Sequence, residues 1–450
     1  MSSESASIAK RRSFTAISVD LFERWMPDAF VLAIALTGLV AAAAAVFAPM
    51  GTPEVIVTSW YSGMFGILSF AFQMILILVS GHTLAHTPPV QRGLKRLVSA
   101  ITTPTQAVVV TFLTAAAASW INWGFGLVVG AVLAREVAKQ VRVDFAWLVA
   151  AAYSGFVIYD SGPSGSIPLS QASPGNALNI VEKVTGHILP YSQSIFTTLN
   201  IVPTLLVLAI MPFVLIRMRP AEHEMQVFVP TPEAAPKPVM QSHLLARRIE
   251  HSRIGSLFLV AAGIAYVAIA SYQGHLIVDA NLVIFVFLMA GLALHGSPLN
   301  FADAVKNAAK QTGSLILQYP VYGGIMGIMT ASGLAQQISS SIAASASAYN
   351  LPVLSFISSI FISLVIPSGG GHWAVQGPFT VPAAVALNAS VSATTMAVAM
   401  GEQVANMLQP FWALPAVAIA GIGIQRVMGF TVVTFLVSTL IYGAALLLLI

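Results

Sequence analysis

Long apolar blocks set the strongest limit on what this chain can fold into. Runs of about 18 or more mostly apolar residues recur along the sequence, the length that a helix needs to cross ~30 Å of hydrocarbon. Only 8% of the residues are charged and 57% are hydrophobic, whereas a soluble domain carries roughly 25% charged residues. So few charges cannot cover a water-soluble surface of this size. The sequence therefore predicts an all-α polytopic membrane protein.

The apolar blocks predict about nine full spans. They lie near 29–48, 61–84, 145–160, 191–216, 254–272, 277–295, 313–345 (long and broken), 393–424 and 428–450. The first block is predicted to be a retained span, because no short apolar core with a small-residue cleavage site follows the basic residues at 10–12 closely. Residues 218–253 are rich in Pro, Glu and Arg, and we expect a cytoplasmic linker that separates a first half, 1–217, from a second half, 254–450.

Two further apolar stretches, 105–138 and 352–388, are interrupted near their middle by polar and glycine residues. Each half has only about 14–16 residues, which is too short to span. This pattern predicts re-entrant helical hairpins that enter and leave on the same side of the membrane. Irregular backbone at such a tip is tolerated only where it is buried in protein or lines a wet cavity.

The distribution of basic residues predicts the orientation. With the N-terminus in the cytoplasm, all but one of the 20 Lys and Arg residues fall on the cytoplasmic side, and Lys183 is the exception. If the first hairpin were a single span, the following loops would change sides and this bias would disappear. The first hairpin therefore enters from the cytoplasm and the second from outside. Two opposed hairpins indicate an inverted repeat, whose binding site lies between the repeats near the midplane.

The tip of the second hairpin, residues 366–373, has the sequence Ile-Pro-Ser-Gly-Gly-Gly-His-Trp. Consecutive glycines permit unusual backbone angles and let a ligand approach the main chain closely. Amides at the start of the returning half-helix would present a positive dipole end to an anion. An ordinary glycine-rich loop is the alternative. The candidate substrate-binding residues at this tip are Ser368, Gly369, Gly370, Gly371, His372 and Trp373.

The tip of the first hairpin, residues 119–126, has the sequence Ser-Trp-Ile-Asn-Trp-Gly-Phe-Gly. Asn and Ser side chains can contact a carboxylate or coordinate a cation, and tryptophans can line an alkyl pocket. Interfacial tryptophans at the headgroup level are the alternative. The candidate substrate-binding residues at this tip are Ser119, Asn122, Trp123 and Gly124.

Glu402 lies well inside an apolar span with no basic residue nearby in the sequence. An unpaired carboxylate at this depth is costly, so it either binds a proton or finds a partner. Asn406 and Gln409 share its helical face, and Pro410 is expected to break the helix beside them. The predicted ion-coupling residues are Glu402, His372 and Asp160, with Asn406 and Trp412 as further substrate-binding candidates. Solvent exposure near the outer surface is the alternative for Asp160, and a structural hydrogen bond is the alternative for Glu402.

Several function classes receive no support from the sequence. Thiolate chemistry is excluded because the chain has no cysteine. We find no metal-ligand spacing, no Walker loop and no serine-hydrolase motif, so we expect no enzyme, no metal site and no cofactor. The net charge of +4 does not predict a nucleic-acid partner, because the positive-inside rule already accounts for where the basic residues lie.

Three stretches, residues 121–137, 366–379 and 409–415, resemble the bacterial short-chain fatty acid transporter family, which includes acetoacetate and butyrate uptake proteins. The resemblance extends from residues 25–28 to the last span. It implies the fold of the ion transporter superfamily, in the bacterial inner membrane. It also implies a homodimer whose mobile transport region carries both hairpins past a scaffold in an elevator-like motion. The family is Gly-rich without an acid after the position of Tyr159, so Asp160 departs from its pattern.

Residue chemistry and resemblance both predict a carrier for a short-chain monocarboxylate such as butyrate, acetate or acetoacetate. The anion would lie between the tips, with its tail near Trp123, Trp373, Phe411 or Trp412. Co-transport of a cation would offset the cost of moving an anion through the membrane. Glu402 and His372 suggest a proton, whereas the Asn- and Ser-rich tips allow Na⁺. A carrier for another carboxylate such as a dicarboxylate, an anion channel and a membrane-embedded enzyme are the alternatives.

Overall fold

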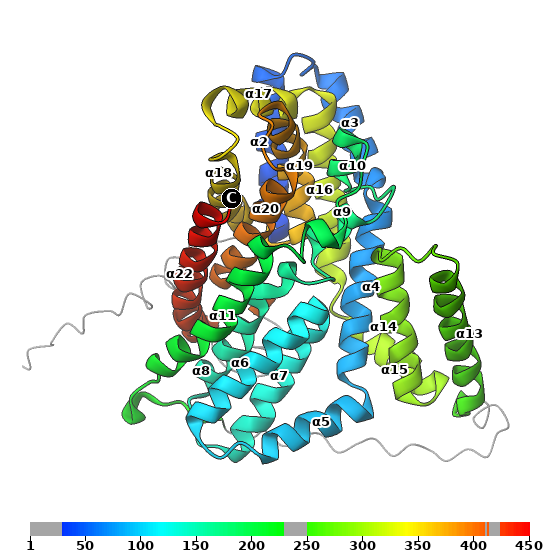
Figure 1. Cartoon of the computed structure of the whole chain (residues 1–450), viewed down its shortest axis with the longest axis vertical. Helices are drawn as coiled ribbons and strands as arrows, with labels where there is room; N and C mark the ends of the chain where they lie inside the picture. Colours follow the sequence, from blue (N-terminus) through cyan, green and yellow to red (C-terminus); the bar gives the residue numbers. More distant parts are fainter. Residues whose placement is uncertain (1–28, 229–249, 410–411, 414–423) are drawn as a thin grey trace, which may run out of the picture.

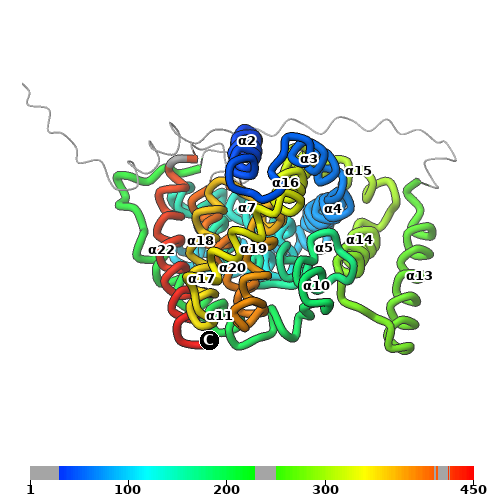
Figure 2. The backbone as a smooth tube through the Cα atoms, turned by 90° about the horizontal axis from the view of Figure 1, so that it is seen from above, coloured from blue at the N-terminus to red at the C-terminus, as the bar shows by residue number. Residues whose placement is uncertain are grey.

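The computed structural model describes residues 29–228, 250–409, 412–413 and 424–450. Within these residues the chain is helical and contains no β-sheet, only one isolated bridge between Asp144 and Val227. The helices pack lengthwise into a tall body, and α13 stands at its edge beside α14 (Figure 1). Seen from above, α2, α3 and α16 lie along one side of this body (Figure 2). The prediction of an all-α fold is confirmed.

In the first half, five α-helices have 18 or more residues, and shorter helices make up the rest. Its helices are α2 (Ala29–Phe47), α3 (Pro53–Gly66), α4 (Leu68–Ala85), α5 (Pro88–Ser99), α6 (Pro104–Ile121), α7 (Trp123–Gln140), α8 (Phe145–Ser154), η1 (Gly155–Ser161), α9 (Ser166–Ala172), α10 (Ile180–Thr185), η2 (Tyr191–Gln193), α11 (Thr198–Arg217) and η3 (Glu222–Glu224).

The second half also contains a helical hairpin followed by a broken helix and a long final helix. Its described helices are α13 (Arg253–Tyr272), α14 (Ala280–His295), α15 (Pro298–Ala309), α16 (Gly313–Ala331), α17 (Leu334–Ser345), α18 (Leu351–Val365), α19 (Gly369–Ala386), α20 (Val391–Ala405), η4 (Asn406–Leu408) and α22 (Ile424–Leu448).

Most predicted spans coincide with helices, but their lengths need correction. Six described helical segments are long and apolar enough to cross a membrane, so the count of about nine stays a prediction. Ser332 and Gly333 separate α16 from α17, which is the break expected in 313–345. The expectation that every hairpin half is too short to span is wrong for α6, because its 18 residues meet the length and apolarity required. The predicted span 393–424 runs partly through residues outside the described part.

Two antiparallel helical hairpins lie where the interrupted stretches predicted them. In the first, Gly126 and Gly130 of α7 pack on Ser119 and Ala115 of α6. In the second, His372 and Gln376 of α19 hydrogen-bond to α18. The residues that cap the two returning helices have almost the same backbone conformation. Asn122 has φ −153° and ψ 121°, and Ser368 has φ −157° and ψ 118°. This similarity supports two related repeats.

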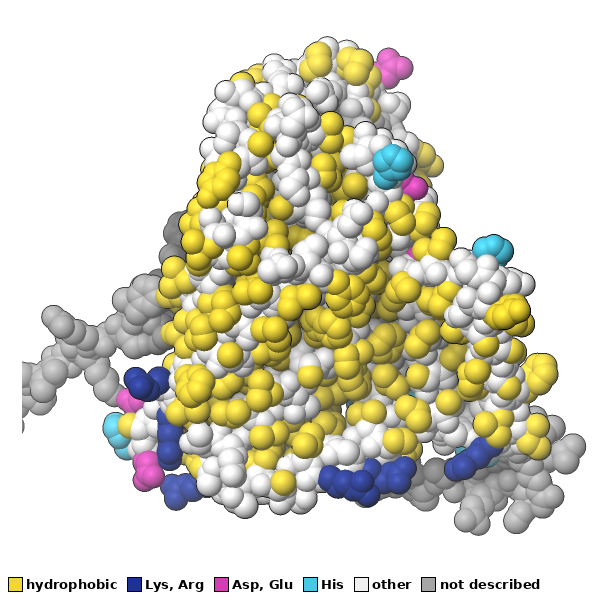
Figure 3. Space-filling view, in the orientation of Figure 1, with side chains coloured by type: hydrophobic (Ala, Val, Ile, Leu, Met, Phe, Trp, Pro, Cys, Tyr) yellow, Lys and Arg dark blue, Asp and Glu magenta, His cyan; other side chains and the backbone are white. Residues whose placement is uncertain are grey.

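The two hairpins open toward opposite ends of the body (Figure 1). The hairpin of α6 and α7 opens beside α5, whereas the hairpin of α18 and α19 opens beside α17. Lys and Arg side chains gather along the end that carries α5 and α15 (Figure 3). On the face shown, this is the charge asymmetry that the positive-inside rule describes. Which end faces the cytoplasm, and whether the hairpins are re-entrant, stay predictions.

The first part of the predicted linker folds back onto the basic end. The Asp144 carboxylate caps α8 through the Trp147 amide (2.8 Å) and accepts the Gln226 amide (2.9 Å). Arg426 at the start of α22 pairs with the same carboxylate at 2.6 Å. Asp144 is fully buried, and loss of its charged partner would leave an uncompensated buried carboxylate. The interactions of the Asp144 carboxylate thus connect the segment near residue 226 to both α8 and α22.

A labelling experiment tests the orientation. The chain has no cysteine, so single cysteines at exposed Arg142 and exposed His187 report on one site each. In intact cells, a membrane-impermeant maleimide should label His187→Cys and should reach Arg142→Cys only after permeabilisation. Labelling of Arg142→Cys from outside would contradict the predicted hairpin topology.

Candidate functional site

Two helices lose regular α geometry where they meet in the middle of the body. After α8 the chain tightens into η1, and after α20 it tightens into η4. Gly155, the first residue of η1, allows a close approach to α6, since a Cβ at this position would lie 2.6 Å from the Ala116 amide nitrogen. Gly401 lets α20 approach α18 equally closely, since its Cβ would lie 2.5 Å from the Phe356 carbonyl. Broken helices of this kind free polar backbone groups at depth.

Glu402 lies between the two broken segments and is fully buried. Its Oε2 accepts a 2.5 Å hydrogen bond from the Tyr159 hydroxyl of η1, and its Oε1 accepts a 3.0 Å bond from Asn406 Nδ2. The Tyr153 hydroxyl donates to the Asn406 carbonyl at 2.7 Å. Of the predicted stripe, Glu402 and Asn406 are hydrogen-bonded to each other, whereas the Gln409 side chain donates to Ser363 of α18. Tyr153 and Tyr159 from the other half contact the Glu402 and Asn406 pair.

Asp160 lies next to this group and is also fully buried. Its Oδ1 accepts from the Ile167 amide of α9 at 3.2 Å, whereas its Oδ2 has no hydrogen-bond partner. Gln403 accepts from the Asp160 amide at 3.1 Å, which ties η1 to α20. The alternative of a solvated Asp160 near the outer surface does not fit this burial.

Within the described part of the chain, neither carboxyl group has a basic partner. Among the described residues, no ion pair includes Asp160 or Glu402, and no group of three or more His, Cys, Asp or Glu is arranged to hold a metal ion. Two buried carboxylates without a compensating cation would be costly, because ionised groups lose their hydration on burial. The burial of these two groups therefore disfavours their ionised forms, because no basic side chain among the described residues compensates them.

The first hairpin tip is anchored to the loop that follows η1. The Trp123 amide donates to Ser164 Oγ at 3.0 Å, and Trp120 Nε1 donates to the Ser161 carbonyl at 3.1 Å. Asn122 caps α7, since its Oδ1 accepts from the Phe125 amide at 2.9 Å while its Nδ2 faces the Ile77 carbonyl at 3.4 Å.

The small residues around this tip permit close packing. A Cβ on Gly124 would lie 2.8 Å from Leu78 Cα of α4, so Gly124 serves helix contact. Ser119 is buried against Gly126, and its Oγ has no hydrogen-bond partner.

The glycines of the second tip are covered by aromatic rings. A Cβ on Gly370 would lie 2.4 Å from the Phe70 ring, one on Gly371 would lie 2.3 Å from the Tyr322 ring, and one on Gly369 would lie 2.6 Å from the Tyr159 hydroxyl. These glycines therefore let the tip approach α4, α16 and η1, whereas the sequence suggested that they leave room for a ligand.

Ser368 caps α19 and links it to the same aromatic cover. Its Oγ accepts from the Gly371 amide at 3.4 Å and donates to the Tyr319 hydroxyl at 3.2 Å. The tip is thereby fixed to α16 by a hydrogen bond as well as by ring contacts.

Trp412 connects the two tips. Its Nε1 donates to the Pro367 carbonyl of the second tip at 2.9 Å, and its ring lies 5.4 Å from the Trp123 ring of the first tip. Phe156 of η1 flanks it at 6.2 Å. Of the predicted alkyl-binding aromatics, the structure brings Trp123 and Trp412 together; Phe411, like Pro410, lies outside the described residues.

Two predicted residues of the second tip do not face the first tip. His372 Nε2 hydrogen-bonds with Ser359 Oγ at 3.1 Å and with Gln376, so it lies inside the second hairpin. Trp373 is fully buried and donates to the Leu178 carbonyl at 3.1 Å. Neither contacts the first tip, and the i, i+4 spacing of His372 and Gln376 is the signal that predicts their local pairing.

The prediction did not include Tyr159, Gln403, Ser164 or Tyr319 among the site residues. Tyr159 precedes Asp160 and Gln403 follows Glu402, so their position next to a predicted acid on a broken helix could have identified them. Ser164 and Tyr319 reach the tips from distant parts of the chain, and no local pattern identifies them.

A family model described as "Short chain fatty acid transporter" matches residues 11–449. A protein of Escherichia coli (strain K12) whose name describes short-chain fatty acid transport is 40% identical over 93% of this chain and 95% of its own length. A protein of Haemophilus influenzae (strain Rd) with the same name is 38% identical over the same shares.

Solved structures of transporters share the fold. The YdaH transporter of Alcanivorax borkumensis superimposes with a TM-score of 0.59 at 15% identity, covering 93% of this chain and 98% of its own. MtrF of Neisseria gonorrhoeae, described as an antimetabolite efflux pump, gives a TM-score of 0.57 at 15% identity, covering 96% of each chain. At this identity the likeness concerns the fold alone.

Packing at the second tip yields a mutational prediction. Gly370→Ala should destabilise the folded protein by ~1–3 kcal/mol, because the added methyl group overpacks against Phe70. Gly93→Ala, on exposed α5 with open space around it, is the matched control and should be neutral or slightly stabilising. Thermal melting in detergent and uptake into vesicles measure both variants. The Phe70→Leu change should partly rescue Gly370→Ala, and equal melting of Gly370→Ala and wild type would refute the ring contact.

Proposed function

The chain belongs to the short-chain fatty acid transporter family, and from this membership we propose that it is a secondary active carrier for short-chain monocarboxylates. Butyrate, acetate and acetoacetate are the substrates proposed. The observation that carries the proposal is the pair of buried carboxyl groups, Asp160 and Glu402, at the meeting point of two broken helices with no basic partner among the described residues. Such a centre favours the uptake of a cation together with an anion.

The substrate is proposed to lie between the two hairpin tips. The second tip presents backbone amides at the N-terminus of α19, where an anion is favoured by both the free N–H groups and the helix dipole. Trp123, Trp412 and Phe156 supply an apolar wall of the kind that a short alkyl tail needs. Because Phe70 and Tyr322 cover this tip, substrate access requires the tip and its aromatic cover to separate.

The proposed motion follows from this contact. The tip of α19 meets α4 and α16 through glycines, which form a smooth surface on which one body can slide along another. We therefore propose an elevator-like movement of the two hairpins and the broken helices relative to a scaffold that includes α4 and α16. The same proposal includes re-entrant hairpins, about nine spans, a homodimer, and an inner-membrane location with a cytoplasmic N-terminus.

A proton on Glu402 is the proposed coupling ion. The carboxyl group can exchange a proton when water reaches it, and Tyr159 and Asn406 hold it in one orientation. Sodium held by oxygen atoms of the tips is the alternative, and the experiment below separates the two.

The rival functions predict different behaviour. A dicarboxylate would need a second positive group, and among the described residues of the centre there is no basic side chain to supply one. A channel would need a continuous wet pore, whereas buried side chains fill the meeting point of the tips. Saturable counterflow of labelled butyrate would favour a carrier, and flux proportional to concentration would favour a channel. Vesicles without protein are the control, because they measure how much butyric acid crosses the bilayer passively in its neutral form.

The coupling proposal predicts a specific phenotype for Glu402→Gln. This variant preserves shape and most hydrogen bonding but cannot titrate. It should retain counterflow exchange in vesicles and lose the protein-dependent part of accumulation driven by a pH gradient. Glu136→Gln is the control, because Glu136 is a partly exposed acid on α7 paired with Lys139.

Two other outcomes would change the conclusion. Accumulation equal to wild type in Glu402→Gln would assign Glu402 a structural role. Accumulation that follows an imposed sodium gradient and ignores pH would move the coupling ion to sodium.

A further inference from the structure

Lys183 stands apart from the other described basic residues. It belongs to α10, near the end of the body where α3 and α17 lie, whereas Lys and Arg side chains gather at the opposite end (Figures 1 and 3). The positive-inside rule gives no reason for a basic residue at this end. Its position therefore calls for a local explanation.

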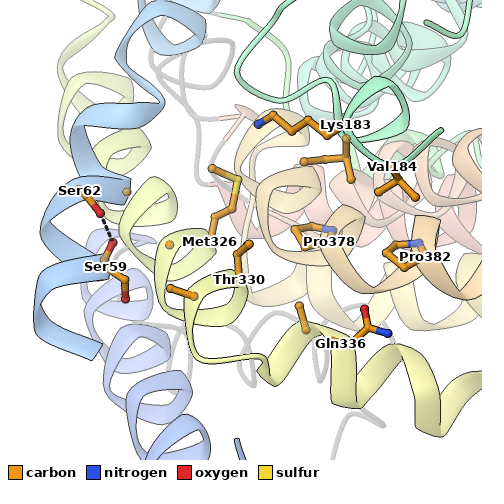
Figure 4. A pocket seen from close by; sticks show the side chains of 14 residues that line it. Ser59, Ser62, Lys183, Val184, Met326, Thr330, Gln336, Pro378 and Pro382 are labelled. Carbon is orange, nitrogen blue, oxygen red and sulfur yellow. Dashed lines mark hydrogen bonds between the residues drawn. The ribbon is translucent and has the colours of Figure 1, made fainter. Parts of the chain in front are cut away.

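A pocket of about 530 Å³ opens beside this residue (Figure 4). One wall comes from α3, α16 and α17, and the facing wall comes from α10 and α19. Lys183 lies across the upper part of the pocket, while Pro378 and Pro382 face it from α19 (Figure 4). The polar lining residues besides Lys183 are Ser59, Ser62, Thr330 and Gln336.

The chemistry of the pocket is that of an amphiphile with one negative charge. The Lys183 ammonium donates to the Ala177 carbonyl, and in the part of the chain that the structure describes it forms no ion pair. The adjacent Glu182 carboxylate is directed elsewhere, because it accepts from the Gly175 amide at 2.8 Å. The apolar residues that line the pocket are Ile180, Val184, Met326, Ala331, Pro378 and Pro382.

The Lys183 side chain is exposed, and its ammonium forms no ion pair with a described residue. Desolvation lowers the pKa of Lys183 from its usual value, and this effect exceeds the opposing influence of Glu182. A bound anion would favour the charged ammonium, so binding of a carboxylate and protonation of Lys183 would support each other.

We propose that this pocket is a second, peripheral binding site for the short-chain carboxylate, with the carboxylate on Lys183 and the alkyl tail against Met326 and the two prolines. The inference rests on the proposed function for the identity of the ligand. It goes beyond that function because the pocket lies along α19 away from the tip at Gly369. A positive group at the mouth of a cleft raises the local concentration of an anionic substrate.

Charge complementarity favours this occupant over others. A neutral or cationic molecule with the same tail gains nothing from the ammonium. The three hydroxyl side chains and the one amide side chain of the lining suit a small polar head. The competing source of an anionic amphiphile is a phospholipid of the surrounding membrane, and the test below separates the two.

The test uses a single cysteine at Ala331, which lines the pocket, in a chain that has no other cysteine. The full-length protein in detergent is treated with N-ethylmaleimide, a neutral reagent, with and without butyrate. Butyrate should slow the labelling of Ala331→Cys, whereas butylamine and butanol should not. A cysteine at exposed Tyr272 on α13 is the matched control and should label at the same rate under all conditions.

Lys183 variants in the Ala331→Cys background complete the test. Lys183→Gln should require about tenfold more butyrate for half protection, the loss expected for a charge-assisted hydrogen bond. Lys183→Arg should keep protection close to that of the parent.

Absence of butyrate protection would overturn the inference, and so would protection that Lys183→Gln leaves unchanged. Protection by phosphatidylglycerol in vesicles without protection by butyrate would also overturn it and assign the pocket to lipid. Since the labelling requires no transport, saturable counterflow in wild-type vesicles tests the proposed function separately.

Discussion

Backbone groups freed inside an apolar body must find partners, and this constraint organises the whole molecule. Each unpaired buried amide or carbonyl costs on the order of 1–3 kcal/mol, and a membrane interior supplies no water to replace the bond. The chain has breaks at Asn122, at residues 366–368, at η1 and at η4, and it brings them together. The Ser164 hydroxyl accepts from the amide of Trp123. The Trp412 indole donates to the carbonyl of Pro367, and the Tyr153 hydroxyl donates to the carbonyl of Asn406.

Small residues and buried acids follow from this meeting of breaks. The helices can approach only because Gly155, Gly369, Gly370 and Gly401 have no side chain where another element passes. Close approach in turn encloses Glu402 with its tyrosine and asparagine partners. The two buried acids of this centre are hydrogen-bonded but have no basic partner among the described residues, and the proposed coupling rests on this combination.

The sequence predicted those features that depend on neighbouring residues. The breaks in both hairpins, the break in 313–345 and the shared helical face of Glu402 and Asn406 follow from composition and helical spacing. Features that depend on distant residues were missed, such as the Tyr159 hydroxyl on Glu402 and the ring of Phe70 over Gly370. A glycine run predicts close approach but does not tell whether a ligand or an aromatic ring makes it. The short amphipathic helices α5 and α15 were missed because a search for long apolar runs passes over them.

The central claim is that substrate binding brings a proton to Glu402. Calorimetric titration of butyrate into the purified protein, repeated in buffers of different ionisation enthalpy, counts the protons taken up on binding and is unaffected by passive permeation. Near neutral pH, where butyrate is ionised, we expect about one proton in wild type and none in Glu402→Gln. Equal proton uptake by the two proteins, or sodium-dependent binding with no proton uptake in wild type, would contradict the account.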